Sequence, residues 1–400
     1  MLYFVYFITS IYCIIKYKIS LPILYIYSGL LFLVSIFLYD DIIMIDHLKS
    51  SLLANLFILI GYILGTNIKP IKKNNIKQLI IDSSSLTFFF KLSILIIIFH
   101  YVLIGIPFLS EQINILRFSQ STSGYAGVPS RIATYIPHLF FILLSLSLGS
   151  NIFTKKQIIF FFATVFLTLI VQGNKSSLLQ IVFLGIIVYP HTLYKKDYLK
   201  YSYLVILASI LIAFFTWSKL NVLEFWLLQD YLVQRYTSIM HETGYFLTGF
   251  NYSDFILIFE NPVLNDLFYP LFKVFTNEVS TLNSQLSRYY YGVLYAEDFS
   301  VPVTPGWYSY HLFIFKNSII TTYIFCFFFG LINAFINSWG HNENNFFKKL
   351  SSLYILYWLY VGYGSGNIYY LVFNVSFCLF FFLLIYKIRG FFYKHNLKNL

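Results

Sequence analysis

Long apolar stretches recur along most of this chain and are separated by shorter polar segments. Of the 400 residues, 58% are apolar and only 11% are charged, and the mean hydropathy is +0.72. A soluble domain typically carries about 25% charged residues, so this chain could not cover itself with a solvated surface. The pattern therefore predicts an all-α fold, a polytopic bundle of transmembrane helices with lipid as its solvent.

We expect about eleven membrane spans, within a range of ten to twelve. The span boundaries follow from where each apolar stretch begins and ends, and a straight span needs roughly 20 residues. The predicted spans lie near residues 2–15, 21–39, 50–67, 87–106, 132–150, 158–172, 176–190, 201–216, 311–338, 351–366 and 367–386.

Clusters of lysine between the spans predict the orientation of the chain. One set of loops, together with the C-terminal tail, holds 17 of the 27 basic residues and three of the 16 acidic residues. Because short cytoplasmic loops are enriched in Lys and Arg, this set is predicted to be cytoplasmic. The C-terminus is then inside, and eleven spans would place the N-terminus outside. The net charge of +11 thus follows from membrane topology, and we expect no nucleic-acid partner.

The predicted organisation has three parts. An N-terminal bundle at 1–216 includes an outer loop at 107–131, a large outer loop covers 217–310, and C-terminal spans with a basic cytoplasmic tail cover 311–400. Apolar helical periodicity at 220–231 and scattered prolines predict short helices in the large loop. The three cysteines all fall in apolar stretches, which predicts neither disulfides nor a metal site, and we expect no cofactor.

Arginine is distributed differently from lysine. The chain has 22 Lys and five Arg, and only Arg389 lies on the predicted inner side. A guanidinium offers phosphate a planar two-donor fork and does not deprotonate, so arginines kept in outer loops favour an anionic ligand at the outer face, a lipid-linked pyrophosphate for example. The alternative is that they pair with outer acids or lipid headgroups. The candidate pyrophosphate-binding residues are Arg117, Arg131, Arg235, Arg288 and Lys175.

Further candidates lie in and after the large loop. A histidine side chain ordinarily titrates near neutrality, so His241 is a candidate base for a sugar hydroxyl, although a hydrogen-bonded surface histidine would look the same. Trp307 and Tyr310 follow a Pro-Gly turn, where aromatic rings either stack on sugars or form an interfacial belt. The Asp40-Asp41 pair leaves open a metal-dependent transferase, or a solvated acidic rim.

A chain with these predicted spans and arginine-bearing outer loops resembles the oligosaccharide repeat-unit polymerases of O-antigen and capsule synthesis (Wzy-type). The likeness rests on the span number, the two arginine-bearing outer loops, the Gly173–Ser177 turn (Gly-Asn-Lys-Ser-Ser) and the segment Thr304-Pro305-Gly306-Trp307. The resemblance implies a glycosyltransferase of the bacterial inner membrane that joins undecaprenyl-pyrophosphate-linked glycans at the outer face, alongside a flippase and a chain-length regulator. O-antigen ligase and lipid-linked oligosaccharide flippase remain alternatives.

By this resemblance the site residues take particular roles. His241 corresponds to the loop histidine of the related ligases and would act as the base. Arg235 and Arg288 would act with it in catalysis, and all the outer arginines would hold the pyrophosphate. Glu242 and Glu278 are substitutes for the base and candidates for sugar contact.

Overall fold

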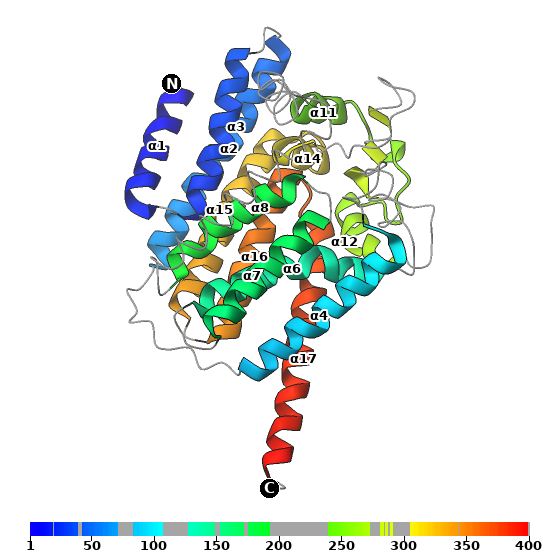
Figure 1. Ribbon diagram of the computed structural model, residues 1–400. Helices are drawn as coiled ribbons and strands as arrows, with labels where there is room; N and C mark the ends of the chain where they lie inside the picture. The colour runs from blue at the N-terminus through cyan, green and yellow to red at the C-terminus, as the bar shows by residue number, and fades with distance from the viewer. Residues whose placement is uncertain are drawn as a thin grey trace, which may run out of the picture. The chain divides into compact units, whose positions relative to one another are not determined.

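The computed structural model confirms the all-α prediction for the part of the chain that it describes. That part comprises residues 1–18, 20–38, 42–70, 83–106, 127–148, 153–171, 175–192, 239–272, 281–283, 285–286, 289–290, 305–343 and 345–398. Every regular element in these residues is a helix, and no strand occurs among them (Figure 1).

The chain divides into two compact units that each combine segments distant in sequence. Unit 1 comprises Met1–Lys73, Phe214–Asn342 and Leu356–Leu371, and unit 2 comprises Asn74–Ala213, Glu343–Ile355 and Val372–Leu400. The predicted divisions follow the loops, whereas these units follow the packing of the helices.

The helices of each unit are as follows. Unit 1 contains α1 (Leu2–Tyr17), α2 (Leu21–Leu38), α3 (Ile42–Ile68), α11 (Ile239–Thr248), η5 (Tyr252–Asp254), α12 (Pro262–Phe272), α14 (Trp307–Ile314), α15 (Ile319–Asn342) and the second half of α16 (Phe346–Ser365). Unit 2 contains α4 (Ser83–Ile104), α6 (Gly127–Ser147), α7 (Lys155–Val171), α8 (Lys175–Val188), η3 (Tyr189–His191), the first half of α16 and most of α17 (Tyr369–Lys398).

Five of the described helices are long and apolar enough to cross a membrane. They are α3, α4, α6, α15 and α17, and shorter apolar helices occur at α1, α2, α7 and α8. Long apolar helices in this number indicate a membrane-embedded, multi-pass protein. The predicted span at 201–216 lies outside the described residues, and the full number of eleven stays a prediction.

Glycines allow α3 and α15 to pack closely in unit 1. A Cβ atom added at Gly61 would lie 2.1 Å from the carbonyl oxygen of Phe327, and one added at Gly330 would lie 2.0 Å from that of Ile58. Gly65 lies four residues after Gly61 and approaches Ala334 in the same way. Since lipid provides no hydrophobic force between helices, such small-residue contacts are a main source of helix association in membranes.

The opposite face of α15 carries large exposed apolar side chains. Ile320, Ile324, Phe328 and Ile332 follow one another at intervals of four residues and are 49–74% exposed. Residues four apart share one face of a helix. A whole exposed face of Ile and Phe suits contact with lipid and not with water.

The predicted span at 311–338 is wrong at its start, because the chain breaks between α14 and α15. Lys316 and Asn317 adopt left-handed backbone conformations, with φ of 50° and 62°. The Asn317 N–H donates to the Leu312 carbonyl at 2.8 Å, which closes the C-terminal turn of α14. Ser318 then precedes α15, and its carbonyl accepts from Thr322 N at 3.1 Å. The spanning helix therefore begins at Ile319, and α14 is a separate short helix.

Unit 2 has a core of interlocked phenylalanines. The Phe90 ring lies 4.4 Å from that of Phe140 on α6 and 4.0 Å from that of Phe161 on α7, and the Phe89 ring lies 4.7 Å from that of Phe382 on α17. These inclined ring pairs join four helices at one level of the unit.

Short helices do occur in the large loop, as predicted. Both α11 and α12 lie in it, and α14 begins near its end, while the periodic stretch at 220–231 lies outside the described residues. The cysteines also lie where the sequence predicts, since Cys13, Cys326 and Cys378 are buried in α1, α15 and α17.

Candidate functional site

The described structure includes only some of the predicted site residues. Arg117, Arg235, Arg288 and Glu278 lie outside the described residues, as does the Asp40-Asp41 pair. His241 lies in α11 and Lys175 begins α8, but in both cases only the helix is described and not the side chain. The side chains that can be placed are those of Arg131, Glu242, Trp307 and Tyr310.

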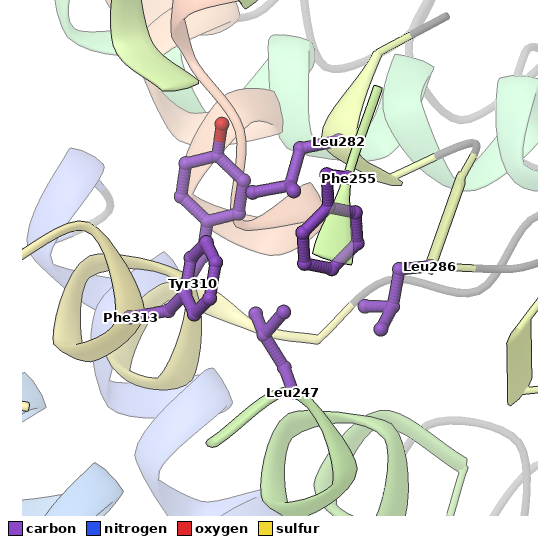
Figure 2. Packing of buried hydrophobic residues seen from close by; sticks show 6 residues of the cluster. All are labelled: Leu247, Phe255, Leu282, Leu286, Tyr310 and Phe313. Carbon is purple, nitrogen blue, oxygen red and sulfur yellow. The ribbon is translucent and has the colours of Figure 1, made fainter. Parts of the chain in front are cut away.

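The helix α11, which carries His241 and Glu242, is held in place by a buried apolar cluster. Its Leu247 side chain is fully buried against Leu282, Leu286, Phe255, Tyr310 and Phe313 (Figure 2). The last two residues belong to α14, so α11 and α14 lie side by side in unit 1 (Figure 1). Burial of this leucine fixes one face of α11, while Glu242 and Tyr245 on the same helix are exposed.

Glu242 is an exposed carboxylate in the first turn of α11. Its Oε2 accepts a hydrogen bond from the Tyr290 hydroxyl at 2.9 Å. Tyr290 is itself buried, and its ring packs edge-on against Phe246 at 5.6 Å. An acid in the first turn of a helix also interacts favourably with the helix dipole. Glu242 is therefore an accessible acceptor in a fixed position, which a sugar hydroxyl or a proton could use.

Trp307 and Tyr310 are buried, so neither presents a free ring face to a sugar in this structure. Trp307 is 4% exposed, and its ring lies 4.0 Å from that of His311 and 4.2 Å from that of Phe329. Tyr310 is fully buried. Both rings pack against neighbouring side chains. Contact of either ring with a sugar stays a prediction, and the burial of the rings does not favour it.

Asp266 is a buried acid that the sequence analysis did not single out. Its Oδ1 accepts from Asn265 Nδ2 at 3.1 Å and from the Leu282 N–H at 3.0 Å. Its Oδ2 accepts from the Tyr310 hydroxyl and from Asn367 Nδ2, each at 2.5 Å. These four donors connect α12, α14 and the turn before α17 through one carboxyl group.

Burial and hydrogen bonding act on Asp266 in opposite directions. Burial raises the pKa of this carboxyl above its ordinary value of 3.8, and the donated hydrogen bonds oppose that rise. Burial and the neighbouring Asp266 likewise raise the pKa of Tyr310 well above 10, which keeps its hydroxyl protonated as a donor. Because Asp266 is fully buried, we assign it to holding the fold of the loop and not to contact with substrate.

Gly306 is the residue from which α14 starts, and a second glycine, Gly366, lies against it. Gly306 has a φ of 77°, which L side chains rarely adopt. Gly366 also has a φ of 77°, and a Cβ added there would lie 2.7 Å from the Gly306 carbonyl oxygen. Two chain segments thus cross at backbone contact, which fixes where α14 begins.

Arg131 belongs to unit 2, near the start of α6. Its guanidinium carbon lies 5.3 Å from the centroid of the Phe373 ring on α17, and the side chain is partly buried. A cation held over an aromatic face gains about 0.5–2 kcal/mol, so the Phe373 ring helps to hold the Arg131 guanidinium in place.

No three His, Cys, Asp or Glu side chains come together as a set of metal ligands within the described part of the chain. Comparison with known proteins gives no match to any family model, curated protein or solved structure.

Proposed function

We propose that this protein polymerises undecaprenyl-pyrophosphate-linked oligosaccharide repeat units into O-antigen or capsular polysaccharide at the outer face of a bacterial inner membrane. The proposal draws on the arginines of the two outer loops and on the multi-pass helical fold. The observation that carries it furthest is the fixed position of α11. This helix presents Glu242 to solvent, includes His241 and follows closely after Arg235 in the sequence.

The chemistry requires an acid–base group and a site for a departing anion. A hydroxyl of the acceptor glycan attacks the anomeric carbon of the donor, and the bond from that carbon to the pyrophosphate oxygen breaks. The acceptor proton passes to His241, with Glu242 or Glu278 as the alternative base. Negative charge develops on the leaving undecaprenyl pyrophosphate.

Arginine suits the task of stabilising that leaving group. Arg117, Arg131, Arg235 and Arg288 would donate paired hydrogen bonds to pyrophosphate oxygens, with Lys175 adding charge. Preorganised donors aimed at developing charge are usually the largest single contribution to catalysis of this kind. A loop that folds over the site would also exclude water, which would otherwise hydrolyse the donor.

The test is the length of surface glycan in a strain from which the gene is deleted. A polymerase deletion leaves single repeat units on the lipopolysaccharide core or its capsular equivalent, and the wild-type gene restores long chains. Arg235→Ala and Arg235→Lys should both fail to restore them, because an ammonium lacks the paired donors of guanidinium. Normal chain length without the gene would refute the proposal.

The surface glycan and the lipid-linked glycan of the same deletion strain distinguish the alternatives. A ligase deletion leaves bare core, with finished polymer retained on its lipid carrier. A flippase deletion leaves bare core with single units retained on the inner face. A metal-dependent transferase would lose activity in EDTA, whereas the mechanism proposed here would not.

A further inference from the structure

A buried polar pair lies directly beneath the helix that carries the candidate base. His47 Nε2 and Ser309 Oγ are 2.8 Å apart, although the two residues are 262 positions apart in sequence. Both side chains are buried, at 9% and 2% exposure. The pair joins the first turns of α3 to α14, and the mechanism above does not use it.

The helix α11 rests on this pair through a glycine. A Cβ added at Gly244 would lie 2.3 Å from Ser309 Oγ and 2.6 Å from the Pro305 carbonyl oxygen. The serine could move aside for a larger residue, but the backbone carbonyl could not. Gly244 therefore allows α11 to lie against the backbone just before α14 and against the Ser309 side chain, at the point where Ser309 bonds His47.

Aromatic side chains enclose the pair on either side. The Tyr245 ring lies 6.4 Å from the His47 ring, and the Tyr308 ring lies 5.5 Å from it, both close to edge-on. Tyr245 belongs to α11 and Tyr308 to α14. The imidazole of His47 is thus surrounded by the same two helices that meet at Gly244.

We propose that His47 and Ser309 are positioning residues that set the placement of α11, and through it the placement of His241 and Glu242 toward the acceptor hydroxyl. The hydrogen bond between His47 and Ser309 fixes the position of the Ser309 side chain, and Gly244 packs against the side chain in that position. The effect on turnover rests on the proposed function, whereas the effect on the placement of α11 does not.

The experiment measures α11 and turnover separately in the full-length protein. Hydrogen exchange of the 239–248 backbone amides reports local opening of α11. Turnover is followed with lipid-linked repeat units extracted from the deletion strain. The variants are His47→Ala, His47→Gln, Ser309→Ala and the double alanine variant. The matched control is Ser352→Ala, a buried serine in α16 whose hydroxyl donates within its own helix to the Lys349 carbonyl at 2.8 Å.

We expect faster exchange in α11 and a kcat lower by about 10- to 100-fold in both single alanine variants, because a displacement of about 1 Å can reduce turnover 100-fold. KM should change much less than kcat, since the arginines proposed to bind the pyrophosphate are untouched. The double variant should be no worse than either single one, as expected for one shared bond. His47→Gln should recover part of the loss, and Ser352→Ala should resemble wild type.

If the Ser309→Ala protein folds and its α11 amides exchange hydrogen as slowly as those of wild type, the pair does not position α11. Faster exchange with unchanged kcat would overturn the catalytic consequence, and so would an equal loss in Ser352→Ala. If the wild-type protein forms no polymer, the proposed function fails, and the exchange result still decides whether the pair positions α11.

Discussion

Asp266→Ala removes the one acceptor on which four buried donors converge, and we expect it to loosen the helices within residues 239–272 before the rest of unit 1. The donors are the side-chain amides of Asn265 and Asn367, the Tyr310 hydroxyl and the Leu282 N–H. Of these residues, Asn367 is 5% exposed and the others are fully buried, so bulk water cannot replace the lost acceptor directly.

The size of the effect follows from the number of donors left without an acceptor. Each buried unpaired donor costs about 1–3 kcal/mol, and a water molecule admitted to the new cavity can satisfy two or more of them. We therefore expect Asp266→Ala to lower the free energy of unfolding of this region by about 2–4 kcal/mol. Tyr310→Phe removes a single donor and should lower it by only about 1 kcal/mol.

The assay is hydrogen exchange of the 262–272 amides together with the thermal midpoint of the detergent-purified protein. Asp254→Ala is the matched control, because this exposed carboxylate in the same loop accepts one capping bond, from Asn251 N at 2.5 Å. Loss of a cap costs about 1 kcal/mol. Equal exchange and equal midpoints for the Asp266 and Asp254 variants would refute the assignment of Asp266 as the residue that holds the loop.

Three further predictions concern pH, helix packing and the arginine of unit 2. The pKa of Asp266 is raised in the folded state, so above pH 3.8 the folded protein binds more protons than the unfolded one. Its stability should therefore fall as pH rises through the folded pKa. Thermal midpoints measured from pH 4 upward should show this fall, and Asp266→Asn should flatten it. Gly330→Ala should lower stability by about 1–3 kcal/mol through overpacking, whereas Gly364→Ala, where an added Cβ meets nothing within 4 Å, should leave the midpoint within about 0.5 kcal/mol of wild type. Phe373→Leu removes the ring under the Arg131 guanidinium and should lower kcat/KM for the lipid-linked substrate about tenfold, and an unaltered kcat/KM would show that this stacking has no part in stabilising the leaving group.

The sequence was sufficient for the fold class because charge and hydropathy act over whole helices. Most of α3 is apolar enough to cross a membrane, and a helix satisfies the backbone hydrogen bonds of such a segment within itself in lipid. The break between α14 and α15 was not predicted, since Phe313 and Ile314 continue the apolar stretch into it. Its signal is the Lys316-Asn317 pair, whose left-handed conformations depend on capping bonds that only the folded chain reveals.

The candidate site could be predicted only as a set of residue types. Glu242 was a reasonable candidate by its position beside His241, but the hydroxyl that holds it comes from Tyr290, 48 residues later. Asp266 and the His47–Ser309 pair were missed because their partners lie far along the chain. Apolar periodicity and loop arginines carry no information about which distant donors meet.

Polymerisation by this protein can be measured with the purified chain in lipid vesicles and lipid-linked repeat units extracted from the deletion strain. We expect a ladder of glycan chains in buffer that contains EDTA, with one undecaprenyl pyrophosphate released for each linkage formed, and no ladder from Arg235→Ala. Repeat units that stay unjoined with the wild-type protein, or that are joined only when a divalent metal is added, would refute the proposed function.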